Sequence, residues 1–160
     1  MTSTSEVELQ PVAGLAAVAG HVVEQFERDS GLAVEHIGAT AFGAGTTKGD
    51  VDVNVRVEPA RFATLVETLK ARYAVAQPEN WTDDFASFST GEYELPLGIQ
   101  VTAIGGENDF LLYLRDRLLA DPGLRARYDA VKADAAPDGP EAYWRAKDAF
   151  LRGLLDERPR

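Results

Sequence analysis

Hydrophobic residues recur along this chain with two different periods, which predict strands and helices in turn. Residues 50–57, DVDVNVRV, alternate without a fault between polar residues and valine. Because successive side chains of a strand point to opposite faces, this segment is predicted to be a strand with one buried and one polar face. Shorter strands are predicted at residues 34–37, 73–76, 85–90 and 93–104, the last with Pro96 marking an edge or a bulge.

Helical spacing of apolar residues predicts the other elements. A first helix over residues 12–29 ends at Asp29-Ser30-Gly31, and a second begins at Pro59. Everything after Glu107 is expected to be helical, with proline and glycine dividing it into helices over residues 108–120, 122–135 and 140–156. Residues 38–49 are expected to form a loop that holds at most one turn of helix.

This order of elements predicts a single α/β (α+β) domain over residues 1–160. We expect a mixed sheet of four or five strands, with helices packed against it and a helical C-terminal tail. A chain of 160 residues suits one domain with a proper hydrophobic core.

The amino-acid composition argues against several classes of partner and of catalytic site. The net charge of -10 makes nucleic acid an unexpected partner, although a local basic patch can still bind a mononucleotide. The absence of cysteine excludes a disulfide framework and a cysteine nucleophile. The sequence has neither the basic start of a signal peptide nor the roughly 18 apolar residues of a membrane span, so a cytoplasmic protein without membrane contact is expected.

The densest chemistry lies in residues 36–55, HIGATAFGAGTTKGDVDVNV, where a glycine-rich loop runs into two aspartates. On a strand, Asp50 and Asp52 share one face at roughly 6 to 7 Å and repel each other. A bound divalent cation would offset that repulsion. A strand, a glycine-rich turn and a second strand with Asp-x-Asp form the pattern with which nucleotidyltransferases hold a nucleoside triphosphate and Mg²⁺.

Each residue of this block has an expected role. Asp50 and Asp52 are the predicted catalytic residues and Mg²⁺ ligands. The backbone N–H groups of Gly38 and Ala39, the hydroxyl of Thr40 and the charge of Lys48 are predicted to contact phosphates. An acceptor hydroxyl or amine would attack the α-phosphorus and expel pyrophosphate, and one aspartate would take its proton.

Several other residues leave alternatives open. Arg56 lies on the aspartate face and either contacts a phosphate or pairs with an acid. His36 is interpreted as structural rather than as a phosphate ligand, and Glu92 and Glu94 are candidates for a third carboxylate. Trp81 and Trp144 either stack on a base or pack in the core, and packing is favoured.

The chain resembles the GrpB family of the nucleotidyltransferase superfamily. The resemblance rests on residues 36–43, HIGATAFG, on residues 48–53, KGDVDV, and on three groups in the closing helices: Leu114-Arg115-Asp116, Tyr128 with Lys132, and Tyr143 with Lys147 and Phe150. It implies that the last helix packs near the site, where Lys147 either contacts a phosphate or is an exposed lysine.

Two departures from the family favour an alternative function. Ala39 stands where the family usually has serine, and Gln100 falls where the superfamily often has a third carboxylate. An amide cannot act as a base. The prediction is therefore a Mg²⁺-dependent transfer of a nucleoside monophosphate from an NTP to a small-molecule or protein acceptor. The alternative is a catalytically inactive nucleotide-binding or regulatory relative, and a purely structural interaction protein is a weaker third hypothesis.

Overall fold

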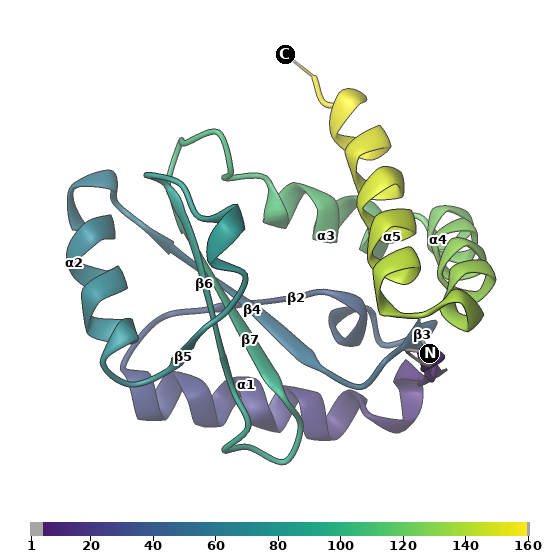
Figure 1. Ribbon diagram of the computed structural model, residues 1–160, viewed down its shortest axis with the longest axis horizontal. Coiled ribbons are helices and arrows are strands. Elements are labelled where there is room, and N and C mark those ends of the chain that lie inside the picture. Colours follow the sequence, from purple (N-terminus) through teal and green to yellow (C-terminus); the bar gives the residue numbers. More distant parts are fainter. Residues whose placement is uncertain (1–4, 160) are drawn as a thin grey trace.

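Five strands form one mixed sheet in this structure, a computed structural model that describes residues 5–159 (Figure 1). In spatial order the strands are β2 (Glu35–Ile37), β4 (Val51–Val57), β7 (Leu97–Ala103), β6 (Phe85–Thr90) and β5 (Ala74–Val75). The central pair β4 and β7 is parallel, and the other neighbours are antiparallel. The predicted mixed sheet of four or five strands is confirmed, with five strands.

The valine face of β4 forms the centre of the main core. Val51, Val53 and Val55 are buried, as the alternation predicts. Helices α1 (Ala16–Ser30) and α2 (Pro59–Lys70) cover this face with their apolar stripes. The opposite, polar face of β4 is therefore left toward the C-terminal helices.

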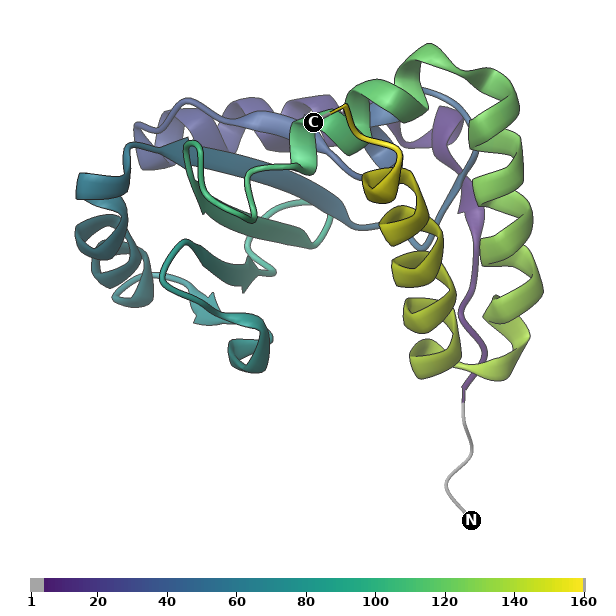
Figure 2. The same ribbon diagram turned by 90° about the horizontal axis from the view of Figure 1, so that it is seen from above.

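Three C-terminal helices pack around a smaller core of their own. They are α3 (Leu111–Ala120), α4 (Pro122–Ala135) and α5 (Pro140–Asp156). Their core comprises Leu114, Leu118, Leu124, Tyr128 and Leu154. Figure 2 shows α4 and α5 at one end of the sheet, away from α2. The predicted bounds of α4 and α5 are confirmed, because proline begins each helix and the Asp121 side chain caps α4 by accepting a hydrogen bond from Leu124 N at 3.0 Å.

The structure differs from the expectations at several element boundaries and in the loop after β2. Helix α3 begins at Leu111 rather than at residue 108. Residues 38–49 contain the 3-10 helix η2 (Ala39–Phe42) and the strand β3 (Thr46–Thr47), which pairs with β1 (Gln10–Pro11). Two-residue strands are too short to show alternation, so the sequence does not predict this small sheet. Strand β7 begins at Leu97 rather than at residue 93, after Pro96, which cannot donate to a ladder. The first helix is preceded by a separate 3-10 turn, η1 (Val12–Gly14).

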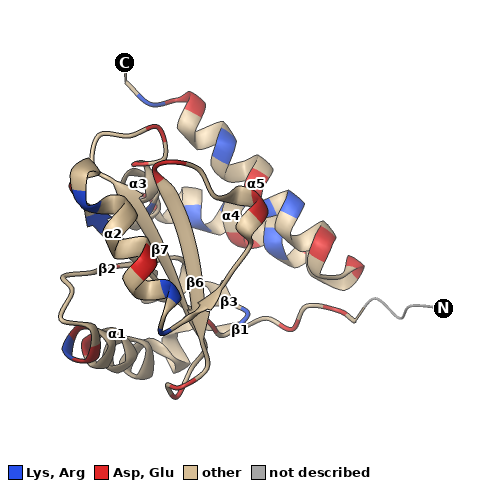
Figure 3. Cartoon of the chain, turned by 60° about the vertical axis from the view of Figure 1, so that its left-hand side comes forward, with Lys and Arg blue, Asp and Glu red and all other residues tan. Residues whose placement is uncertain are grey.

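Charged side chains of both signs are interspersed along α4 and α5 (Figure 3). On α5, Arg145 pairs with Glu141 and Arg152 pairs with Asp148, each one turn apart. Within residues 5–159, no helix combines the length and the apolar character that crossing a bilayer requires.

Candidate functional site

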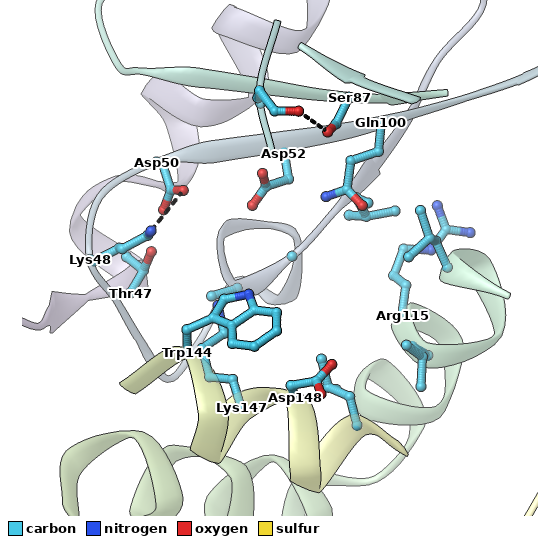
Figure 4. A pocket seen from close by; sticks show the side chains of 18 of the residues that line it. Thr47, Lys48, Asp50, Asp52, Ser87, Gln100, Arg115, Trp144, Lys147 and Asp148 are labelled. Atoms are coloured by element: carbon cyan, nitrogen blue, oxygen red, sulfur yellow. Dashed lines mark hydrogen bonds and ion pairs between the residues drawn. The ribbon is translucent and has the colours of Figure 1, made fainter. Parts of the chain in front are cut away.

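A cavity of about 430 Å³ lies between the polar face of the sheet and the C-terminal helices. Strands β4, β6 and β7 supply one wall, and α3 and α5 supply the other (Figure 4). The lining includes these polar side chains: Thr47, Lys48, Asp50, Asp52, Gln77, Ser87, Ser89, Gln100, Arg115, Lys147 and Asp148. Leucines of α3 and α5 line its apolar part: Leu111, Leu114, Leu118 and Leu151.

Two glycines make room for the carboxylate of Asp52. Gly38 follows β2 with a φ of 76°, a conformation that side chains rarely adopt, and a Cβ there would lie 2.8 Å from Asp52 Oδ2. Gly98 is the register partner of Asp52 on β7, and a Cβ there would lie 2.5 Å from Asp52 Oδ1. The carboxylate is therefore enclosed by backbone on two sides and faces the cavity.

Asp50 and Asp52 both line the cavity, as predicted from their spacing. Burial by the surrounding protein, followed by repulsion from Asp50, raises the pKa of Asp52 from 3.8 to about 7, while Lys147 and Lys48 act in the opposite direction. Lys48 Nζ lies 3.7 Å from Asp50 Oδ2. Asp52 therefore holds its proton more tightly than an ordinary aspartate, because its carboxyl group is buried beside Asp50.

Lys147 reaches this pair from α5. Its side chain lines the cavity and its Nζ lies 5.3 Å from the centre of the Tyr143 ring. Burial lowers the pKa of Lys147, and the charges of Asp52 and Asp50 raise it in partial compensation. The structure therefore brings Lys48, Lys147 and both aspartates into one site, from segments that lie far apart in the sequence.

Two candidate residues lie outside this site. Arg56 is on the aspartate face, but further along β4 than Asp52, where its guanidinium donates two 2.7 Å hydrogen bonds to Asp109. The Thr40 hydroxyl is buried and lies 2.9 Å from His36 Nε2. Neither residue lines the cavity: Arg56 pairs with an acid, which is one of its two expected alternatives, and the Thr40 hydroxyl contacts His36 in place of the cavity. His36 has the expected structural role, while Gly38 and Ala39 do line the cavity.

The two candidates for a third carboxylate lie outside the cavity. Glu92 Oε1 lies 3.7 Å from Arg72 Nη2, and neither Glu92 nor Glu94 lines the cavity. Gln100 does line it. Among residues 5–159, no group of three or more His, Cys, Asp or Glu side chains could hold a metal ion. A cation here would depend on Asp50 and Asp52, with the remaining ligands from substrate and water.

Trp144 and Asp148 line the cavity, although the sequence analysis does not predict either as a site residue. It favours packing for Trp144 and does not single out Asp148. Trp144, Lys147, Asp148 and Leu151 line the cavity from one face of α5. Their spacing of three and four residues is the available signal, because such residues share a helix face. No pattern within the helix indicates that this face meets the aspartates.

Two side chains of helix α4 form hydrogen bonds with Thr46, close to Lys48 in the chain. Lys132 Nζ donates to Thr46 O at 2.5 Å and lies 3.2 Å from Asp129 Oδ1. Asp129 in turn accepts hydrogen bonds from the Thr46 N–H and hydroxyl, both at 3.3 Å. Lys132 is almost fully buried, and its burial lowers its pKa against the effect of Asp129. The two α4 side chains thus hold β3 immediately before Lys48 and Asp50.

A family model, a curated relative and a solved structure match this chain. The sequence model described as GrpB protein matches residues 13–157. A UPF0157 protein of Vibrio cholerae is 28% identical over 125 residues, which cover 78% of this chain and 66% of that protein's own length. The crystal structure of the conserved protein GrpB from Enterococcus faecalis superimposes with a TM-score of 0.66 at 21% identity, covering 94% of this chain and 96% of that one. The structural likeness shows a shared fold.

Proposed function

The chain belongs to the GrpB family, and from the geometry of its cavity we propose that it binds a nucleoside triphosphate with Mg²⁺ and transfers the nucleoside monophosphate to an acceptor. One observation carries the proposal. Asp50 and Asp52 face a cavity beside the Gly38 turn, with Lys48 and Lys147 lining the same space. This set of groups suits a cation and a polyphosphate together.

The two carboxylates meet the requirements of Mg²⁺ bound through phosphates. Such a cation usually takes one or two protein carboxylates and completes its shell with substrate oxygens and water. The pKa of Asp52 is raised because its protein neighbours do not fully compensate the like-charged pair and its burial. Asp50 and Asp52 would hold the ion, which would neutralise phosphate charge when bound.

The other groups of the cavity would bind the phosphates, and an aspartate would accept the acceptor's proton. Lys48 and Lys147 would balance the negative charge of the phosphates, and the Gly38 turn lets the backbone approach them closely. The acceptor hydroxyl or amine forms a bond to the α-phosphorus, and the bond from that phosphorus to the bridging oxygen breaks. Pyrophosphate leaves with the electron pair. Asp52 is the proposed recipient of the acceptor's proton, because Gln100 cannot accept it.

A second candidate function is nucleotide binding without turnover, as in a regulatory protein. Gln100 favours it, because an amide lines the cavity where a third carboxylate would assist catalysis. Both functions require the same binding step. They differ in whether pyrophosphate is released.

Thermal unfolding in the presence of each NTP, with and without Mg²⁺, tests the binding step. A ligand at 100 times its Kd should stabilise the fold by about 2.7 kcal/mol. Asp52→Asn keeps the side-chain shape and should abolish the Mg²⁺-dependent part of the shift. The absence of any shift at millimolar concentrations of all nucleotides would contradict the proposal. Pyrophosphate release, assayed with pools of small-molecule and protein acceptors, then separates the two functions.

A further inference from the structure

Trp144 is unusually exposed for a tryptophan and lines the proposed nucleotide cavity. The residue retains 47% of its accessible surface, and its indole projects from α5 toward the sheet (Figure 4). Within the described residues, the other large exposed hydrophobic side chains are Val75 and Leu119, neither of which lines the cavity. Exposed aromatic surface of this kind inside a cavity is available to a flat ligand.

A second cavity of about 470 Å³ adjoins the first at Trp144. Five side chains line both cavities: Lys48, Gln77, Tyr143, Trp144 and Lys147. The two lysines that would balance phosphate charge therefore stand at the junction. A ligand whose phosphates lie between these lysines can place its remaining part against Trp144.

The spacing along α5 matches such a ligand. Lys147 follows Trp144 by three residues, so the two side chains leave the same helix face about 4.5 Å apart along the axis. One helix face thus presents an aromatic surface next to a cation. This is the combination with which proteins hold the base and the phosphates of a nucleotide.

Gln77, which lies outside α5, adds a polar side chain to the lining of both cavities. It lies between β5 and the 3-10 helix η3 (Pro78–Asn80), and its φ of 44° makes it the one non-glycine residue with positive φ in the described part of the chain. That conformation is costly for a residue with a side chain. The segment is held by hydrogen bonds to Ala76 O from Trp81 Nε1 at 3.0 Å and from the Ser87 hydroxyl at 2.8 Å. The side-chain amide of a residue at this position can donate to and accept from the edge of a base.

We propose that Trp144 is the stacking surface for the base of the bound nucleotide and that Gln77 contacts the edge of that base. The inference rests on the proposed function, because it takes the phosphates to lie between Lys48 and Lys147. Since every base has a flat π face, stacking on Trp144 accepts any base and favours the larger purines.

A single-tryptophan protein reports directly on this contact. The chain contains two tryptophans, Trp81 and Trp144, and Trp81 packs edge-on against Phe88 away from the cavity. In Trp81→Phe, Trp144 is the sole tryptophan emitter. This variant loses the hydrogen bond from Trp81 Nε1 to Ala76 O, so its affinity for ATP with Mg²⁺ is first compared with that of wild type. Its fluorescence should be quenched by ATP with Mg²⁺ and unaffected by tripolyphosphate with Mg²⁺, which carries the charges without a base. Calorimetry should show that both ligands bind to this variant.

Affinities of a Trp144 variant provide the second test. Trp144→Ala should weaken ATP binding roughly 5- to 150-fold, the loss expected for one stacked base, and leave tripolyphosphate binding unchanged. Trp144→Phe should recover most of the loss. Leu119→Ala, which shortens a similarly exposed side chain outside the cavity, is the matched control and should bind both ligands as wild type does.

The outcomes separate this inference from the function on which it rests. If wild type binds tripolyphosphate and ATP, and Trp144→Ala weakens both equally or neither, the base does not stack on Trp144 and the inference is overturned while the nucleotide site stands. If wild type binds neither ligand with Mg²⁺, the proposed function and the inference both fail. Gln77→Ala should reduce discrimination among bases; unchanged discrimination would remove Gln77 from the contact.

Discussion

The carboxylate of Asp52 lies directly over the Cα of Gly98, its register partner in the parallel pair of β4 and β7. A Cβ on residue 98 would stand 2.5 Å from Asp52 Oδ1, closer than two such atoms can approach. The orientation of Asp52 toward the cavity therefore depends on the absence of a side chain on the neighbouring strand.

Gly98→Ala should displace the Asp52 side chain. Overpacking of this kind costs about 1 to 3 kcal/mol, and we expect a loss of that size in the free energy of unfolding, together with weaker Mg²⁺-dependent nucleotide binding. The cost should be smaller when Asp52 is already alanine, because the clashing carboxylate is gone. Urea midpoints of the single and double variants measure this coupling. Gly91→Ala, whose Cβ would meet nothing within 4 Å, is the control. Equal costs in both backgrounds would show that Asp52 is not what the alanine meets.

Asp52→Asn should change how stability depends on pH. The pKa of Asp52 is about 7 in the folded protein against 3.8 for an unperturbed aspartate, so between these values the folded state binds the extra proton. Stability of the wild type should therefore fall as pH rises through this range, by on the order of 1 to 3 kcal/mol, and this fall should be absent from the amide variant. Urea unfolding at pH 5 and pH 8 checks the sign. A variant less stable than wild type by the same amount at both pH values would mean that the carboxylate makes structural hydrogen bonds instead.

Arg56→Met and Lys147→Met should separate two cationic candidates that the sequence treats alike. Lys147 lines the cavity, so its loss should weaken nucleotide binding at least about fivefold. Arg56 pairs with Asp109 outside the cavity, so its loss should leave binding unchanged and cost about 1 kcal/mol or less of stability. Calorimetric titrations of the two variants test this directly. Weaker binding in Arg56→Met, or unchanged binding in Lys147→Met, would contradict the assignment.

Lys132→Met should destabilise the fold strongly for a lysine substitution. It removes the hydrogen bond to Thr46 O and the cationic partner of Asp129, whose side chain is partly exposed, so the loss should be about 1.5 to 3 kcal/mol, the contribution of a hydrogen bond from a charged donor. Lys70→Met is the control, because Lys70 forms an exposed pair with Glu67 that is worth about 0 to 1 kcal/mol. Denaturant midpoints compare the two. Similar losses in both variants would show that the buried contacts of Lys132 contribute little.

The sequence alone determined the elements whose signals are local. The alternation over residues 50–57 specifies the strand β4 (Val51–Val57) and its faces, because side-chain direction in a strand depends only on position. Proline and glycine set the bounds of α4 and α5, because they act on the backbone of their own segment. The proximity of Asp50 to Asp52 follows from the same local geometry.

Tertiary structure decided which of these local features meet. Lys147 and Trp144 face the aspartates because the small core of the C-terminal helices places α5 over the polar face of the sheet. Arg56 shares that face, but its guanidinium donates hydrogen bonds to Asp109, 53 residues away in sequence. Gly98 lies under Asp52 only because β7 pairs in parallel with β4. Such contacts depend on how segments that are distant in the sequence pack together, so no short window of the chain specifies them.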